Sequence, residues 1–124
     1  MAKLIMIISG VSAGLSVILG AFASHGLKNK ISAEMLAVFK TGVDYQFYHS
    51  FALALIGLSL IVSDIEKSQF LTWSFIFFGV GIVFFSGSLY LLALTKNKIF
   101  GPITPLGGLF FIFGWLFFVL HWIN

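Results

Sequence analysis

Residues 68–95 read SQFLTWSFIFFGVGIVFFSGSLYLLALT, a stretch without Asp, Glu, Lys or Arg. A helix needs about 20 predominantly apolar residues to cross the hydrocarbon core of a bilayer. Three more charge-free runs of similar length lie at 4–27, 45–63 and 99–124. Their polar residues do not alternate as in a barrel strand. The sequence therefore predicts four transmembrane helices, at 4–24, 44–63, 69–94 and 104–123.

The composition excludes a water-soluble domain. Of the 124 residues, 60% are hydrophobic and 9% are charged, and the mean hydropathy is +1.10. Soluble domains have about 45–50% apolar and about 25% charged residues. All seven basic residues are Lys, which argues against nucleic acid as a partner because bidentate base and phosphate contacts favour Arg. Without Cys there is no disulfide or thiolate site. We predict one all-α transmembrane domain over residues 1–124.

The connections predict an up-down-up-down four-helix bundle. Residues 64–68, DIEKS, form a tight polar turn that makes the second and third spans antiparallel neighbours. Ser32 fits the N-cap of a short amphipathic helix at the membrane interface before the second span, with Glu34 in its first turn. Pro105 fits the first turn of the fourth span, with Thr104 as its N-cap.

Lysines are distributed unevenly between the two ends of this bundle. One end carries Lys28, Lys30, Lys40, Lys96 and Lys98, and the other carries Lys3 and Lys67. Cytoplasmic loops are enriched in Lys and Arg. We therefore expect both termini outside the cell, in a multi-pass protein of the bacterial plasma membrane.

Small residues recur at the intervals that bring helices close together. Lipid tails are as apolar as Leu, so close backbone approach, rather than hydrophobicity, joins membrane helices. The candidate packing residues are Gly10, Ser12, Gly14, Ser16, Gly20, Gly87, Gly107 and Gly108. One hypothesis is that they pack the helices within a single chain. The other is that one stripe, on the first span, pairs with a second copy to form a homo-oligomer.

The unusual polar residues gather at the Lys-rich end of the predicted bundle. The candidate site residues are His25, Tyr45, Gln46, His49, Ser86, Ser88, Tyr90 and Thr104. Tyr45 and His49 are four residues apart and share a helix face. His49 lies about 7 Å deeper than Asp44 at 1.5 Å per residue. A polar side chain at that depth faces the bundle interior or finds a partner.

Three hypotheses explain this cluster. It is a hydrogen-bonded network that joins helix ends, a pocket for a small ligand or a lipid headgroup, or a haem or metal site that uses His25 and His49. No catalytic constellation or nucleotide-binding motif is visible. We therefore expect a non-catalytic binding or scaffolding protein that has membrane lipid as a partner. The alternative is a small-solute carrier or channel in which His49 gates or senses protons.

Four ordered motifs resemble a known family. They are GAFASHGL at 20–27, YQFYH at 45–49, FSGSLY at 85–90 and TPLGG at 104–108, followed by Gly114-Trp115. Together they are similar to the YgdD/YwdK-type small membrane proteins, a family of unknown function. The resemblance spans nearly the whole chain and implies a four-helix integral membrane protein of the plasma membrane. It implies no activity. Ala23-Ser24 stands where the family pattern has Gly-Ala before the first His.

Overall fold

The computed structural model describes residues 1–64 and 68–124, and these form helices joined by turns. The segments η1 and η2 are π-helical, and η3 is a short 3-10 helix. In chain order the elements are α1 (Ala2–Phe22), η1 (Ala23–Leu27), α2 (Ala33–Val62), α3 (Gln69–Gly81), η2 (Ile82–Ser86), α4 (Gly87–Thr95), η3 (Lys98–Phe100) and α5 (Ile103–Ile123).

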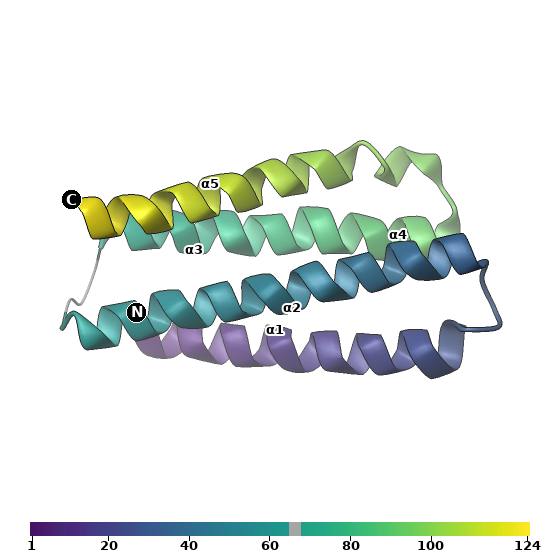
Figure 1. The fold of residues 1–124 in the computed structure, drawn as a ribbon, viewed down its shortest axis with the longest axis horizontal. Coiled ribbons are helices and arrows are strands. Elements are labelled where there is room, and N and C mark those ends of the chain that lie inside the picture. The colour runs from purple at the N-terminus through teal and green to yellow at the C-terminus, as the bar shows by residue number, and fades with distance from the viewer. Residues whose placement is uncertain (65–67) are drawn as a thin grey trace.

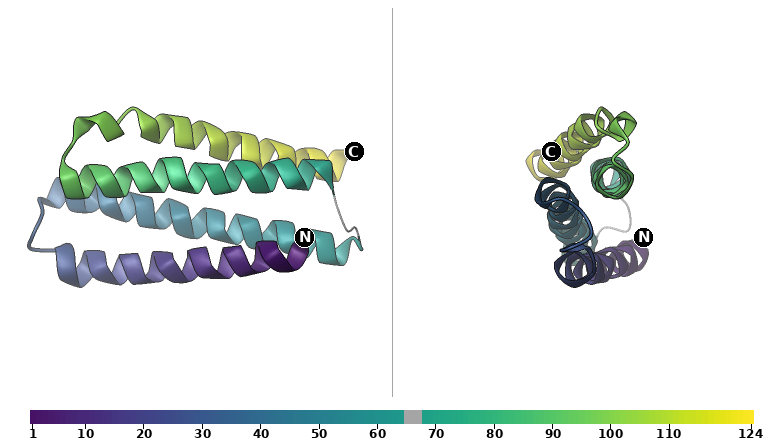
Figure 2. Two further views of the ribbon diagram at one scale, coloured as in Figure 1. Left: turned by 180° about the vertical axis from the view of Figure 1, so that it is seen from behind. Right: turned by 90° about the vertical axis from the view of Figure 1, so that its right-hand side faces the viewer.

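The elements join into four rods, each long and apolar enough to cross a membrane. The rods lie side by side and alternate in direction, and both termini lie at the same end of the bundle (Figures 1 and 2). This arrangement confirms the predicted up-down-up-down four-helix bundle.

The bundle consists of two helical hairpins. α1 packs along α2, and the α3–η2–α4 rod packs along α5. The hairpins meet where α2 contacts α4, η2 and, less extensively, α3. The backbones of α2 and α5 stay apart, so that side chains bridge the space between these two helices.

The second helix begins earlier than predicted. The expected interfacial helix is not separate, because α2 continues without a break from Ala33, well before the predicted start at residue 44. Its apolar residues pack on neighbouring helices: Phe39 is buried and contacts the rings of Phe22 and Tyr90. Gly42 lets the Tyr90 ring approach, since a Cβ there would lie 2.8 Å from that ring. Tertiary packing thus extends the helix beyond the apolar run.

The helix starts agree only in part with the prediction. Ser32 is the N-cap of α2, and its Oγ accepts a hydrogen bond from the Met35 N–H. Thr104 is not an N-cap: α5 starts after Pro102, and Thr104 lies within the first turn with Pro105. In the predicted 64–68 turn, Asp64 has a left-handed φ of 51° and Ser68 caps α3. Glu66 and Lys67 lie outside the described residues.

The π-helical segment η2 changes the neighbour on which the α3–η2–α4 rod packs. A π-helical turn accommodates an extra residue, and one residue corresponds to about 100° of helix rotation. Before η2, α3 packs chiefly on α5, and after it α4 packs chiefly on α2. Phe78 on α3 therefore joins the core around Phe111, whereas Ala93 on α4 joins the core around Phe39.

Glycines set the closest helix contacts. A Cβ on Gly107 would lie 2.3 Å from the Phe85 backbone nitrogen, so that only glycine allows α5 to approach η2 this closely. The Phe111 ring lies over Gly81, and the Phe78 ring lies over Gly114. These interlocked rings and glycines hold the second hairpin together.

Candidate functional site

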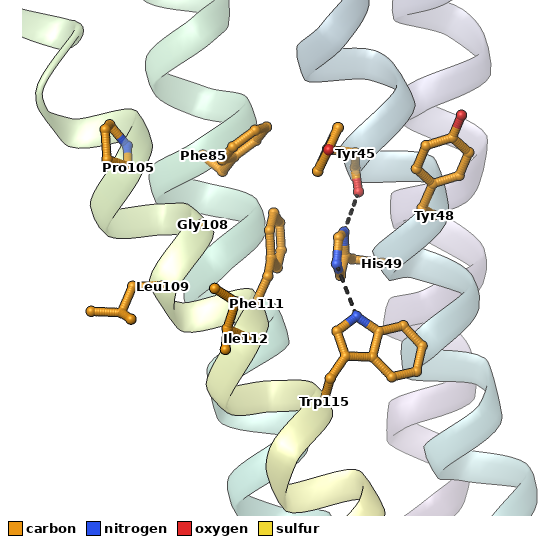
Figure 3. A pocket seen from close by; sticks show the side chains of 10 residues that line it. All are labelled: Tyr45, Tyr48, His49, Phe85, Pro105, Gly108, Leu109, Phe111, Ile112 and Trp115. Atoms are coloured by element: carbon orange, nitrogen blue, oxygen red, sulfur yellow. Dashed lines mark hydrogen bonds between the residues drawn. The ribbon is translucent and has the colours of Figure 1, made fainter.

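A groove of about 690 Å³ separates α2 from α5. Tyr45 and His49 form the α2 wall, and Leu109 and Ile112 form the α5 wall (Figure 3). Trp115 reaches from α5 toward α2 and closes the deeper end. The opposite end, at Pro105, lies toward the loops that carry most of the lysines. The groove is therefore an aromatic and aliphatic slot that is closed at one end.

His49 is buried at the side of this groove, and both of its ring nitrogens have partners. Nδ1 lies 2.8 Å from the Tyr45 carbonyl oxygen, which can only accept a hydrogen bond, so Nδ1 carries the proton. Nε2 lies 3.4 Å from Nε1 of Trp115, which can only donate, so Nε2 is the acceptor. These contacts fix a neutral imidazole with a defined tautomer, and they join the two hairpins.

Aromatic rings surround His49. Its ring stacks on Phe111, with 3.4 Å between centroids and 5° between planes. Tyr45 stacks on Phe85 at 4.5 Å, and Phe78 and Trp115 contact the His49 ring at wider angles. This cluster forms the inner side of the groove.

A second polar network lies on the other side of α2. The Tyr90 hydroxyl donates to Oε1 of Gln46 at 2.7 Å, and Nε2 of Gln46 donates to the Ser12 carbonyl at 2.9 Å. The Ser9 hydroxyl donates to the Ser50 carbonyl at 2.8 Å, and the Ser50 and Ser12 hydroxyls lie 2.7 Å apart. The network ties α1, α2 and α4 together at mid-length of α1.

The remaining predicted site residues do not form one cluster. Ser88 and Thr104 join α4 to α5 through a 2.6 Å hydrogen bond between their hydroxyls. Ser86 is fully buried in η2, and its hydroxyl has no hydrogen-bond partner within residues 1–64 and 68–124. Polar residues at this end thus meet in pairs and small networks, on both sides of α2.

His25 lies apart from His49. It is exposed in η1, at the end of α1, whereas His49 faces α3 and α5 on another side of α2. Phe22 of α1 contacts Phe39 of α2, and Phe39 precedes His49 by ten residues, about 15 Å along the helix. The paired-histidine geometry on which the haem or metal hypothesis depends is therefore not formed.

The candidate packing residues divide into two groups. Ser16 is buried, Ser12 bonds to α2, and a Cβ on Gly20 would contact Val43 at 3.4 Å. Gly107 and Gly108 lie beside Phe85. By contrast, a Cβ on Gly10, Gly14 or Gly87 would meet no atom within 4 Å in the described structure.

A family model described as "Protein of unknown function (DUF423)" matches residues 19–108. The chain belongs to this family. A UPF0382 membrane protein of Staphylococcus saprophyticus is 45% identical over 95% of both chains. The UPF0382 protein YwdK of Bacillus subtilis is 42% identical over 95% of this chain and 94% of its own. The inner membrane protein YgdD of Escherichia coli is 36% identical over 92% and 85%, respectively. No solved structure matches.

The DUF423 membership confirms the resemblance drawn from the four motifs. These relatives are named as membrane or inner membrane proteins, which agrees with four membrane-spanning helices. Phe111 of the groove was not singled out from the sequence, and Trp115 entered only through the Gly114-Trp115 pair of the family resemblance. The spacing of these two residues could have predicted their place: they follow Gly107 at intervals of four residues and therefore share its helix face.

Proposed function

We propose that this DUF423 protein is a non-catalytic membrane protein that binds a phospholipid in the groove between α2 and α5. The main support for this proposal is the shape and lining of the groove. Its walls are apolar, Trp115 lies across the deeper end, and the opposite end, at Pro105, lies near the Lys-rich loops. Its volume of about 690 Å³ is within the usual range for ligand sites. An acyl chain fits between Leu109, Ile112 and the aromatic inner side.

The headgroup end of the groove supports the same proposal. The hydroxyls of Tyr45 and Tyr48 make no hydrogen bond within the described chain, and both side chains are exposed. Phenolic hydroxyls donate to ester and phosphate oxygens, and Tyr is enriched where membranes meet water. Lys28, Lys30, Lys40, Lys96 and Lys98 are exposed at the same end of the bundle, where they favour anionic headgroups.

The state of His49 favours binding over catalysis or transport. A general base or proton relay needs a ring nitrogen free to take a proton. Here Nδ1 donates to a backbone carbonyl and Nε2 accepts from Trp115.

The lysine distribution supports an orientation as well. Five described lysines lie at the end with the 28–32 and 96–102 loops, and Lys3 lies at the other end with both termini. By the positive-inside rule, we propose that the loops are cytoplasmic and the termini extracytoplasmic. The bound lipid then belongs to the cytoplasmic leaflet.

Native mass spectrometry of protein purified in a mild detergent tests the proposal. We expect one retained phospholipid per chain and its loss in Gly108→Leu. A Cβ there would only touch the Phe85 ring at 3.8 Å, and Gly108 lines the groove, so the added side chain occupies the space proposed for the lipid. Gly87→Leu, which adds a side chain outside this groove, is the matched control and should retain lipid. Equal retention in the wild type and Gly108→Leu would overturn the proposal.

A further inference from the structure

Trp115 lies across the groove between α2 and α5 at an unusual depth for a tryptophan. On α5 it is about 18 Å from Ile103 and about 12 Å from Ile123, at 1.5 Å per residue. Tryptophan is enriched where membranes meet water, because its ring is apolar and its N–H needs a polar partner. An indole near the middle of a span therefore has a role other than anchoring at the interface.

Three contacts hold the indole in this place. Its Nε1 donates to Nε2 of His49 at 3.4 Å, which gives the N–H a partner away from water. Phe78 of α3 meets the ring edge-on at 5.0 Å between centroids, and Phe118 of α5 does so at 5.9 Å. Residues of α2, α3 and α5 thus fix the ring, and 41% of Trp115 stays exposed at the groove (Figure 3). The indole therefore forms a fixed end to the groove.

The length of the groove matches the depth of one leaflet. On α5 the lining begins at Pro105 and ends at Trp115, about 15 Å further along the helix. The hydrocarbon core is about 30 Å thick, so the acyl chains of one leaflet reach to about 15 Å. Among residues 1–64 and 68–124, none deeper than Trp115 lines the groove. A chain that enters beside Pro105 therefore meets the indole near its own end.

We infer that Trp115 sets the length of the acyl chain that the groove accepts, and that His49 positions the indole for this role. The inference rests on the proposed phospholipid site and names the part of the lipid that the site distinguishes. A chain that is too short leaves part of the groove unfilled and loses van der Waals contacts. A chain that is too long has to bend out of the groove at the indole. The protein should therefore prefer one chain length over both shorter and longer chains.

Native mass spectrometry tests this preference directly. The delipidated protein in mild detergent is mixed with equal amounts of saturated phosphatidylglycerols whose chains run from twelve to twenty carbons, and each bound lipid is identified by its mass. Trp115→Ala opens the deeper end and should shift the retained lipid to longer chains. Ile112→Trp places an indole about 4.5 Å nearer to Pro105 and should shift it to shorter chains. Ile112 lines the groove and is 65% exposed, so the new ring has room there.

Val119→Trp is the matched control for the added indole. Val119 lies one turn beyond Trp115, is 52% exposed and is not among the described residues that line the groove. Its replacement should leave the preferred chain length unchanged. Ile112→Trp decides the question alone if Trp115→Ala does not fold. Circular dichroism and elution volume report the folding of each variant.

The outcomes separate this inference from the proposed function. The same chain lengths in the wild type, Trp115→Ala and Ile112→Trp would overturn the inference and leave the phospholipid site in place. A shift in Val119→Trp as large as the shift in Ile112→Trp would overturn it too, because the effect would not depend on the groove. No retained phospholipid in the wild type would overturn the proposed function and the inference with it.

Discussion

The His49 imidazole joins α2 to α5 through one hydrogen bond and one stacked ring. Its neutral tautomer follows from its partners, since the Tyr45 carbonyl can only accept and the Trp115 indole can only donate. Protonation would place an N–H against the indole N–H. The residue therefore acts as a structural link between the two hairpins.

The replacement His49→Phe tests that link. Phenylalanine keeps an aromatic ring beside Phe111 but removes the acceptor for Trp115, so the free energy of unfolding should fall by about 0.6 kcal/mol, the average for a hydrogen bond within a membrane. Denaturation in mixed micelles with increasing dodecyl sulfate measures this change.

A double-mutant cycle gives the control. Trp115→Phe removes the other partner, and the double variant should lose less stability than the sum of the two single losses because both remove the same bond. Strictly additive losses would show that the two side chains do not interact.

At the scale of single residues, the sequence predicted which polar side chains are present but not where they point. The predicted bundle end contains Gln46 and Tyr90, and they bond to each other across 44 residues. His25 belongs to the same predicted cluster, yet it is exposed. Hydropathy fixes the depth of a residue along a span, whereas its direction depends on how each helix is rotated, and that rotation is set by packing.

Among the elements, the contact between α5 and η2 depends on a single glycine. Gly107→Ala should lower the free energy of unfolding by about 1–3 kcal/mol, the usual cost of overpacking, because the new Cβ would meet the backbone of Phe85, which cannot rotate away. The same dodecyl sulfate titration measures the loss.

Gly87→Ala is the matched control on the facing rod. No atom lies within 4 Å of a Cβ at Gly87, so its stability should stay within about 0.5 kcal/mol of the wild type. Equal losses for the two variants would contradict the close approach at Gly107.

The outward face of α1 provides the third prediction. A Cβ on Gly10 or Gly14 would meet open space, and this spacing favours close helix pairing in membranes. If two copies pair through α1, Gly10→Leu and Gly14→Leu should abolish energy transfer between donor- and acceptor-labelled chains in liposomes. Val119→Leu, on the exposed face of α5, should not change it. Unchanged transfer in the glycine variants would contradict pairing through α1.

The boundaries of the elements were predictable wherever hydropathy alone decides them. The third and fourth spans begin and end within one residue of the prediction. The start of α2 was missed because Lys40 and Asp44 look like the edge of a span. The side chains of Lys40 and Asp44 are both exposed. The helix nevertheless includes these two residues, because Phe39 and Leu36 pack on neighbouring helices. The π-helical shift in η2 has no signal in the composition.

The orientation of the whole molecule can be measured with single cysteines, since the sequence has none of its own. Asn29→Cys should resist a membrane-impermeant maleimide in intact cells and react after permeabilisation, because Asn29 lies beside Lys28 and Lys30. Asn124→Cys, at the opposite end, should react in intact cells. The reverse pattern would contradict the proposed orientation.

The division of the bundle into two helical hairpins has a consequence for the order in which the helices fold during synthesis. α1 packs on α2 and relies little on the helices that follow, so that the first hairpin has its partners once residue 62 has left the ribosome. Chains generally fold from the N-terminus during synthesis. The second hairpin then finds a finished surface on α2. Insertion into the bilayer can therefore proceed in two paired steps, and the Gln46 amide already has the Ser12 carbonyl as a hydrogen-bond partner before Tyr90 has been translated.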